Sequence, residues 1–251
     1  MSNQFYKWPL LLALLVALST TNLHAADDDD VDYLELAVLM LRDGNIDRAL
    51  NALQQVDTSV EEFDWAKYHR LHGMAYLRSG NKELAKESLE KAIESGANEA
   101  VVFVYLAQVS FDLGDYQAAI DALNRAQANV ERIASTYHMR AQAHWLLKQY
   151  PDALAALDQA SQVFPDDYAF QRRKVFYLID LGLYQEAAEQ GQEYLDRSDG
   201  GLEDYVAIGD ALRRSGQVDR ALRFLEIAKL RFPDDTLVSK VLAHAYIDKS
   251  S

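Results

Sequence analysis

The sequence predicts an all-α protein in which short helix pairs stack on one another as a solenoid. Three observations support this prediction: a pattern that recurs every 34 residues, small side chains at fixed places within it, and a composition that favours helix. The chain has 251 residues, with four prolines, eleven glycines and no cysteine. Few helix-breaking residues and a hydrophobic content of 49% are typical of a helical protein with a buried interior.

The first 25 residues have the pattern of a secretory signal peptide. Lys7 gives a short cationic start, the eleven residues from Trp8 to Leu18 are mostly apolar, and Ala25 and Ala26 provide a small-residue exit. This run falls well short of the roughly 20 residues that a membrane-spanning helix needs. We therefore expect residues 1–25 to be removed, which leaves no stable membrane anchor. An uncleaved anchor is the alternative.

Residues 26–30 form an acidic leader, which we expect to be solvated, with Asp30 placed to cap the first helix. The run lacks the glycine and the terminal glutamate of a calcium-binding loop. The whole chain carries 39 acidic and 25 basic residues, a formal charge of −14. A surface this acidic disfavours nucleic acid and anionic lipid as partners, because their phosphates attract clustered Lys and Arg.

The pattern of residues 111–126, FDLGDYQAAIDALNRA, recurs along the rest of the chain. Its glycine, Gly114, stands where a helix must end and the chain must turn, a place that often requires a positive φ. Equivalent positions follow at steps of 36, 34, 34, 34 and 34 residues. Each unit is thus predicted to be a helix, a tight turn and a second helix. These reference positions are Gly44, Gly80, Gly114, Lys148, Gly182 and Gly216.

Small side chains occupy fixed places on both helices of each unit. Seven residues before the reference position, every copy except the fifth has Ala or Gly, and the fifth has Val175. Because small residues let helix backbones approach closely, these positions should form the contacts between helices. Five residues after the reference position, all six copies have alanine: Ala49, Ala85, Ala119, Ala153, Ala187 and Ala221.

The period, the LGDYQAAIDAL turn and second helix, and the prolines of VFPDD and RFPDD, Pro165 and Pro233, resemble the tetratricopeptide repeat family. The resemblance covers about residues 31–249 and implies a right-handed superhelix of about six repeats. We expect looser packing in the fifth repeat, where Val175, Gly191 and Tyr194 depart from the pattern. The repeats implied are about 30–63, 66–99, 100–133, 134–167, 168–201 and 202–235, followed by a capping helix at 236–249.

The first predicted helix, in VDYLELAVLMLRDG (31–44), is apolar on nearly every face. A helix of this kind is normally buried all round, so something should cover it. Its own N-terminal residues are one candidate. A contact with a partner protein, or with a second copy in a homodimer, is the other.

Members of the tetratricopeptide repeat family bind extended or helical protein segments on a concave face lined by the first helices. By this resemblance, the groove positions lie thirteen, ten, six, three and two residues before each reference position. Aromatic and Arg residues among them are the types enriched at interface hot spots. The predicted groove residues are Lys67, Arg70, Met74, Leu77, Arg78, Gln108, Phe111, His138, Gln142, Trp145, Arg172, Phe176, Ile179, Asp210, Arg213 and Arg214.

The groove positions of all seven first helices carry eight basic and five acidic side chains, within a chain that is acidic overall. This inversion would attract an anionic ligand. We therefore predict a partner segment with acidic residues or a free carboxylate, anchored near Phe111, Trp145 and Phe176. The alternative is that the Arg residues pair with neighbouring acids and that the aromatic rings pack between helices.

The sequence gives little indication of catalysis or of a cofactor. His69 and His72 lie three residues apart on one helix, but two ligands without a carboxylate make no metal site. We find no glycine-rich phosphate loop, nucleophile elbow or metalloprotease motif in the sequence. We therefore expect neither a cofactor nor enzymatic activity.

These features together predict a secreted adaptor that binds a protein or peptide segment in the periplasm of a bacterium. The segment would belong to an assembly of the cell envelope, such as a pilus, a secretion or polysaccharide-export system, or an outer-membrane complex. One alternative is a regulator of an envelope hydrolase. Another is a structural protein that self-assembles through its apolar first helix. The bacterial assignment rests on the style of the leader and on the resemblance to envelope repeat proteins.

Overall fold

The computed structural model describes residues 31–126 and 133–250, and these residues form thirteen α-helices and no strand. The predicted all-α solenoid is thereby confirmed. The expected signal peptide (1–25) and acidic leader (26–30) lie outside the described residues. No helix in the described ranges is long and apolar enough to cross a bilayer.

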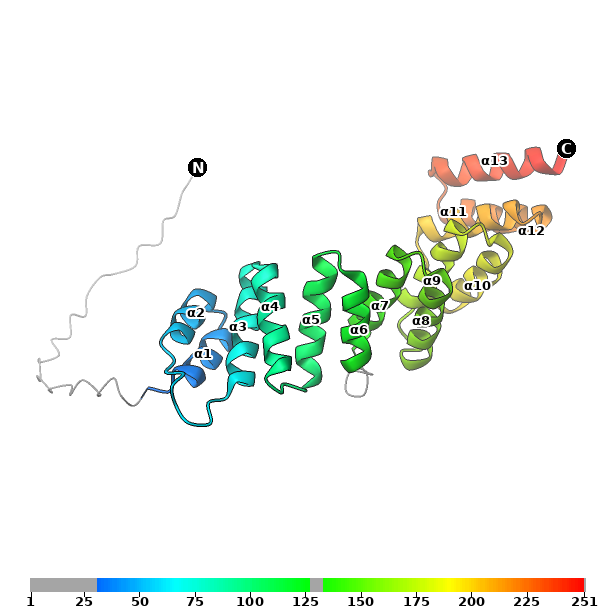
Figure 1. Cartoon of the computed structure of the whole chain (residues 1–251). Helices are drawn as coiled ribbons and strands as arrows, with labels where there is room; N and C mark the ends of the chain where they lie inside the picture. The colour runs from blue at the N-terminus through cyan, green and yellow to red at the C-terminus, as the bar shows by residue number, and fades with distance from the viewer. Residues whose placement is uncertain (1–30, 127–132, 251) are drawn as a thin grey trace, which may run out of the picture.

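Six helix pairs joined by tight turns precede a single last helix, α13 (Thr236–Ser250). Figure 1 shows the pairs standing in a row, with the later helices turned relative to the earlier ones. The first helices of the pairs are α1 (Tyr33–Arg42), α3 (Trp65–Ser79), α5 (Ala100–Asp112), α7 (Ala134–Leu146), α9 (Ala169–Asp180) and α11 (Leu202–Arg214). The second helices are α2 (Ile46–Gln54), α4 (Lys82–Glu94), α6 (Tyr116–Ala126), α8 (Tyr150–Val163), α10 (Tyr184–Arg197) and α12 (Val218–Arg231).

The odd-numbered helices line the inner side of the stack. Each helix packs against its neighbours in the chain, and successive odd-numbered helices also contact one another, as α1 does α3 and α9 does α11. Among the described residues, the even-numbered helices have no comparable contact with one another. Closer spacing on one side makes the row curve toward that side. Because α1 and α13 lie at opposite ends of the row in Figure 1, the inner side is open.

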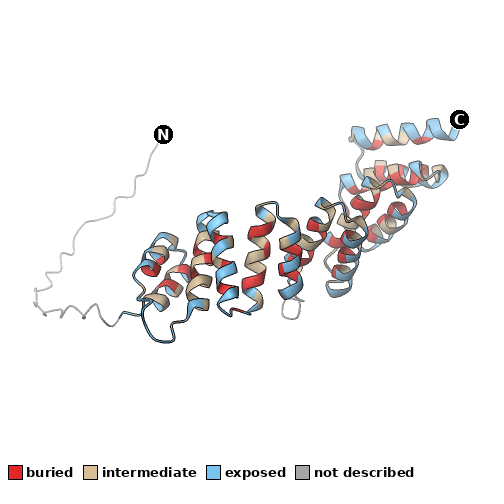
Figure 2. Cartoon of the chain, in the orientation of Figure 1, coloured by how far each residue is buried: buried red, intermediate tan, exposed pale blue. Residues whose placement is uncertain are grey.

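Small side chains in register hold the pairs together. The six alanines that follow the reference positions are all fully buried. Figure 2 shows the buried residues, in red, on the helix faces that are turned toward other helices. A Cβ atom added to Gly73 of α3 would lie only 2.6 Å from Cγ of Leu89 in α4. Close packing of this kind leaves no room for a larger residue without displacing the leucine.

In the fifth pair, α9 and α10, the larger residue of this contact lies on the first helix and the glycine lies on the second. Val175 replaces the small residue of the first helix, and Gly191 replaces the leucine of the second. Ile208 of α11 fills the space above Gly191, where an added Cβ atom would lie 2.5 Å from Cγ1 of Ile208. Val175, Tyr194 and Ile208 form one buried cluster. The expectation of looser packing is therefore wrong at these residues, because Ile208 of the next repeat fills the space that Gly191 leaves.

All six reference positions have a positive φ, from +60° at Lys148 to +83° at Gly80. The turn at Lys148 is closed by two backbone hydrogen bonds. Its own N–H donates to the carbonyl of Trp145 at 2.9 Å, and that of Gln149 donates to the carbonyl of His144 at 2.8 Å. A residue with a Cβ atom adopts this conformation at a cost of about 1 kcal/mol, so Lys148 is a strained member of the set.

The first helix begins two residues later than the sequence suggests. Asp32 precedes α1, and its Oδ1 atom accepts hydrogen bonds from the N–H groups of Leu34 and Glu35, both at 3.0 Å. The residue that caps this helix is therefore Asp32 and not the expected Asp30, which lies outside the described residues.

The apolar surface of α1 is only partly covered by the described residues. Ala37 and Leu41 are buried, whereas Leu39 is 42% exposed. A groove of about 320 Å³ beside α2 is lined on the α1 side by Tyr33, Leu36 and Met40. An apolar face of this kind is a candidate contact surface.

Candidate functional site

All sixteen predicted groove residues lie on α3, α5, α7, α9 and α11. We call the solvent-facing side of the odd-numbered helices the inner wall. Arg78, Gln142 and Arg214 are exposed, and the other thirteen residues are half-buried. Their contacts with neighbouring helices decide how much of each side chain remains free for a ligand.

Two basic residues of α3 form ion pairs with the helices on either side. Lys67 pairs with Glu35 of α1, and Nη1 of Arg70 lies 2.5 Å from Oε1 of Glu99, the residue that precedes α5. All four side chains keep contact with water, so each pair contributes about 0–1 kcal/mol to stability. The positive charges of Lys67 and Arg70 are nevertheless offset by carboxylates of this chain.

The remaining predicted residues of α3 also contact neighbouring helices. Arg78 donates to the carbonyl oxygen of Leu41 and thereby completes the C-terminal end of α1. Met74 packs against the apolar cluster of the first pair, and Leu77 packs against a cluster of α4 and α5. These side chains join successive pairs, so only part of their surface faces the groove.

The centre of the inner wall, on α5 and α7, exposes apolar and amide side chains. Val101 and Leu146 are 43% and 44% exposed. Gln142 is exposed, and Gln108 donates from Nε2 to Oδ1 of Asp112 at 3.0 Å along the same helix. The inner-wall ion pairs of the described residues lie on either side of this centre and do not cross from α5 to α7.

Stacked aromatic rings join α7 to α9. The ring centroids of His138 and Phe170 lie 4.0 Å apart, and those of Trp145 and Tyr177 lie 3.8 Å apart, each pair with an angle of 16° between the ring planes. Phe170 is fully buried. His138 and Trp145 are half-buried, so each uses one part of its ring in this contact and leaves the rest at the groove.

His138 acts as an aromatic surface rather than as a cation near neutral pH. Its burial lowers its pKa below the ordinary value of 6.5, and the positive charge of Arg173 adds to this effect. Its Nδ1 atom is buried and has no hydrogen-bond partner among the described residues. Phe111 is also held in place by a ring, since it meets Tyr116 of α6 edge-on with centroids 5.3 Å apart.

Arg172 joins α9 to the start of α11. Its Nη2 atom lies 2.6 Å from Oε2 of Glu203, and its Nε atom lies 2.6 Å from Oδ1 of Asp204, which is only 4% exposed. Burial alone would lower the pKa of Arg172, but the bonds to Glu203 and Asp204 outweigh burial and raise it. The guanidinium also lies 4.7 Å from the ring centroid of Phe176. The charge of Arg172 is therefore largely offset within the chain, by two carboxylates that accept two of its five N–H groups.

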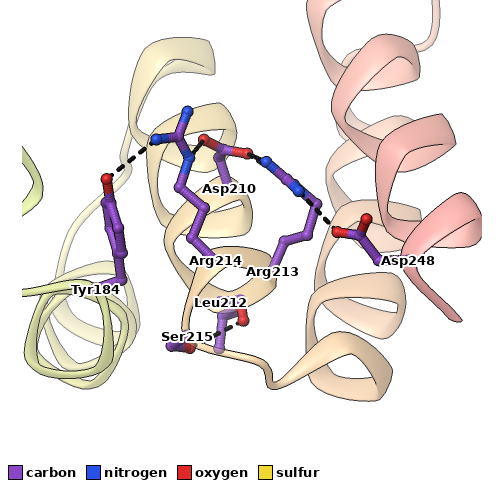
Figure 3. A network of polar contacts seen from close by, with 7 residues as sticks. All are labelled: Tyr184, Asp210, Leu212, Arg213, Arg214, Ser215 and Asp248. Carbon is purple, nitrogen blue, oxygen red and sulfur yellow. Dashed lines mark hydrogen bonds and ion pairs between the residues drawn. The ribbon is translucent and has the colours of Figure 1, made fainter. Parts of the chain in front are cut away.

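A charged network covers the C-terminal part of the inner wall, as Figure 3 shows. Asp210 lies 2.9 Å from Arg213 and 2.6 Å from Arg214. Arg213 also reaches Asp248 of α13 at 2.7 Å, and Arg214 donates to the hydroxyl of Tyr184 at 3.0 Å. The bond to Asp248 is the main cause that raises the pKa of Arg213. The two positive and two negative charges offset one another. In the same region, Ile179 packs between two apolar clusters.

The basic excess predicted for the groove is thus largely offset by acids of the same chain. Six of the eight basic groove residues have a carboxylate within ion-pair distance. Arg78 and Lys240 have none among the residues that the structure describes. The geometry matches the alternative in which the Arg residues pair with neighbouring acids, and the acidic partner stays a prediction.

Sequence reasoning missed four residues that shape the inner wall: Val101, Leu146, Phe170 and Tyr177. The first two occupy groove positions, thirteen and two residues before their references, so the repeat pattern already points to them. Phe170 and Tyr177 lie twelve and five residues before Gly182. The presence of two aromatic residues at these positions is the sequence signal that could have identified the aromatic contact between α7 and α9.

His69 and His72 belong to an aromatic cluster of α3. The ring of His69 stacks on Trp65 with centroids 5.6 Å apart, and that of His72 meets Tyr68 edge-on at 4.6 Å. Burial, assisted by the charge of His69, lowers the pKa of His72 to about 4. Residues 31–126 and 133–250 contain no group of three His, Cys, Asp or Glu side chains that could hold a metal ion.

Family descriptions of the tetratricopeptide type match the middle of the chain. The description "Tetratricopeptide repeat" matches residues 66–95 and, in a second form, residues 138–201. The description "Anaphase-promoting complex, cyclosome, subunit 3" matches residues 85–160. These matches cover helices α3 to α10 of the stack.

Curated relatives share the repeats but are much longer proteins. The chain is 27% identical over 95 residues to anaphase-promoting complex subunit 3 of Schizosaccharomyces pombe, which is 38% of this chain and 14% of that protein. It is 24% identical over 195 residues to tetratricopeptide repeat protein 13 of Homo sapiens, which is 75% of this chain and 22% of that protein. The chain therefore spans less than a quarter of the length of either relative.

Solved structures share the fold at low sequence identity. A crystal structure of MamA superposes with a TM-score of 0.57 at 22% identity, covering 64% of this chain and 94% of that one. PilF of Pseudomonas aeruginosa superposes with a TM-score of 0.53 at 15% identity, covering 84% of this chain and 96% of that one. The period, the stacked helix pairs and the family matches agree, and the chain is a tetratricopeptide repeat protein.

Proposed function

We propose that the protein is a non-catalytic adaptor whose inner wall binds a polypeptide segment at its centre, over α5 and α7, and along the adjoining ring of Phe176 on α9. The tetratricopeptide repeat matches support a role in protein interaction. The choice of the centre of the inner wall as the binding surface rests on one observation. The charges of the flanking helices are largely paired within the chain, whereas Val101, Gln142 and Leu146 are exposed.

The chemistry of the centre favours a segment with apolar side chains. Phe111, Trp145 and Phe176 are half-buried and held by neighbouring rings or by a guanidinium, so a ligand meets preformed ring surface at little cost in entropy. The exposed amide of Gln142 can both donate to and accept from the backbone of the segment. Acidic residues of a partner would be attracted by Arg78 and Lys240, outside the centre, and would influence mainly the rate of association.

The compartment that we propose is the periplasm of a bacterium, and its support is the signal-like pattern of residues 1–25. The fold shared with PilF of Pseudomonas aeruginosa provides a bacterial precedent for the fold. In the envelope, the adaptor would serve the assembly of a multi-subunit complex such as a pilus, a secretion or polysaccharide-export system, or an outer-membrane complex. Mass analysis of the protein from envelope extract checks the leader, since the proposal requires the loss of about residues 1–25.

Photo-crosslinking in intact cells tests the proposed groove. A crosslinking amino acid replaces Gln142 on the inner wall or, as the control, Gln159 on the exposed face of α8. The proposal predicts a discrete adduct from position 142, none from position 159, and several subunits of one complex among the captured proteins. A captured hydrolase would favour the alternative of a hydrolase regulator. Equal adducts from both positions would exclude the inner wall as the binding site.

A further inference from the structure

The exposed face of α12 differs from the matching face of the other repeats. Arg220, Arg223, Ile227 and Leu230 follow one another at helical spacing on its solvent side, and we call them the α12 strip. Ile227 is 60% exposed, and Leu230, at 83%, is the most exposed large hydrophobic residue among those that the structure describes. At the positions of Ile227 and Leu230, the described residues of the earlier repeats are all polar: Gln55, Thr58, Lys91, Glu94, Arg125, Gln159, Gln162, Glu193 and Asp196.

The two arginines of the α12 strip have no ion pair within residues 31–126 and 133–250. Arg220 donates one hydrogen bond to the side-chain amide oxygen of Gln192, at 2.5 Å, and another to that of Gln217. Both acceptors are neutral. Arg223 is exposed. The strip therefore combines two unbalanced positive charges with two exposed aliphatic side chains. Exposed apolar surface next to unpaired charge is typical of a contact site rather than of a solvated helix face.

A surface with the opposite charge lies at the other end of the stack. A cleft of about 480 Å³ is formed by the start of α1, the end of α2 and the loop of residues 57–64. Its apolar lining includes Val60 and Val31, which are 57% and 41% exposed. Glu61 and Glu62 are exposed beside them and have no ion-pair partner among the described residues. We call this surface the N-terminal cleft.

The two ends also differ in their total charge. Residues 31–65 contain eight acidic and two basic side chains, a net charge of −6. Residues 218–250 contain five acidic and six basic side chains, a net charge of +1. In a chain of charge −14, the last two helices therefore carry a net charge opposite in sign to that of the first pair, which favours an approach of these two ends in different molecules.

We propose that the α12 strip of one copy docks into the N-terminal cleft of a second copy. Ile227 and Leu230 meet the apolar lining of the cleft, while Arg220 and Arg223 pair with Glu61 and Glu62. The two surfaces lie at opposite ends of the row in Figure 1, so a molecule does not satisfy its own cleft. Such a head-to-tail contact joins copies into short chains or a ring. It uses no predicted groove residue, so it goes beyond the adaptor function and leaves the inner wall open.

Sedimentation velocity of the purified protein tests the contact. Because the surfaces are small, we expect weak, reversible association over about 5 to 500 µM. The contact predicts a rising average mass that falls again in about 0.5 M NaCl, where exposed charges are screened. The double variants Glu61→Lys/Glu62→Lys and Arg220→Glu/Arg223→Glu should each stay monomeric. An equimolar mixture of the two should associate again, because each variant then meets an end of opposite charge.

The control is Glu83→Lys/Glu90→Lys, which makes the same change of charge on the exposed face of α4 and should associate like the unchanged protein. Circular dichroism of each variant checks that the helices are retained. A monomer of constant mass at all concentrations would overturn the proposal. Association that persists in either charge-reversal variant would also overturn it. The same holds if both variants are monomeric and their mixture does not associate. None of these results depends on the partner of the inner wall, so they leave the adaptor function untouched.

Discussion

Two neighbouring contacts between odd-numbered helices are built in opposite ways. Between α7 and α9, the rings of Trp145 and Tyr177 stack with centroids 3.8 Å apart, and a second stack lies beside them. Between α9 and α11, Arg172 reaches Asp204 at 2.6 Å. The backbones of α9 and α11 come closer to each other than those of α7 and α9 do. The contrast shows that one repeated fold tolerates either a wide aromatic contact or a close ionic one.

Side-chain size explains which contact forms where. Twelve and five residues before the reference, α9 carries Phe170 and Tyr177, which keep its backbone away from α7. At the same positions α11 carries Asp204 and Ala211, and these small side chains let it approach α9. Short distances then favour a polar bridge across the surface, whereas a wider gap must be filled by rings, since interiors are close-packed.

The contrast bears on how the inner wall is used. The ionic contacts consume charge that could otherwise meet a ligand, and the aromatic contact leaves ring surface at the groove. The centre of the wall is therefore suited to apolar recognition and the flanks mainly to holding the stack together. The following variants break or sharpen this comparison, in order of decreasing effect.

Removing a ring from the aromatic contact should have the largest effect. Phe170 is fully buried, so Phe170→Ala should lower the free energy of unfolding by about 3–5 kcal/mol through lost burial and a cavity. Urea denaturation followed by circular dichroism measures the change. Phe111→Ala, at a half-buried ring of the groove, is the control and should cost about 1 kcal/mol. Equal losses would show that the α7–α9 contact depends on no particular ring.

Breaking the ionic contact should have a smaller effect that depends on salt. Arg172→Met keeps the length of the side chain but leaves the buried carboxylate of Asp204 without its charged partner. Since Arg172 is itself partly exposed, we expect a loss of about 1–2 kcal/mol at low salt. Arg197→Met removes an exposed pair with Glu193 and should cost less than about 0.5 kcal/mol. A loss from Arg172→Met that matches this control would argue against a structural role for the ionic contact.

Acidification should weaken the aromatic contact through His138. The folded protein holds the pKa of His138 below 6.5, so the unfolded chain binds a proton more readily as the pH falls below that value. The stability that the neutral ring contributes is therefore present above pH 6.5 and is lost on acidification. His138→Phe should flatten this part of the curve of unfolding free energy against pH, whereas His244→Phe on α13, an exposed position, should not. Parallel curves for all three proteins would contradict the assignment.

Relieving strain in the turn at the end of α7 should give the smallest effect. Lys148 has a φ of +60°, and the same turn position in the preceding repeat is Gly114 with a φ of +80°. Lys148→Gly should raise the free energy of unfolding by about 0.5–1 kcal/mol. Gly114→Ala should lower it by about 1 kcal/mol, since an added Cβ atom there meets no atom within 4 Å and only the backbone is strained. Thermal denaturation of both variants shows whether each one is stabilised or destabilised. A higher stability of Gly114→Ala would contradict this account.

Much of the fold follows from the sequence, because a fixed period and recurring small residues dictate one way to pack helix pairs. The six alanines show this most directly, since all are fully buried. The state of the groove charges was harder to predict. Arg172 pairs with Glu203 and Asp204, 31 and 32 residues away, and such pairs exist only once the stacking distance between repeats is fixed. Opposite charges almost one repeat apart are the sequence signal that could reveal them.

The tight packing of the fifth pair also could not be predicted from the pattern of a single repeat. Val175 and Gly191 each break the pattern, and together they suggested a loose contact. The compensating residue, Ile208, lies in the next repeat. Packing in a solenoid is shared between neighbours, so the pattern has to be compared across two repeats to predict it.

The affinity of the captured partner segment for two double variants tests most directly whether the centre of the inner wall is the binding surface. Phe111→Ala/Leu146→Ala alters the centre, and Arg214→Gln/Lys240→Gln alters the C-terminal flank. Isothermal titration should show a loss of about tenfold or more for the centre and less than about threefold for the flank. A larger loss at the flank than at the centre would contradict the proposed apolar recognition.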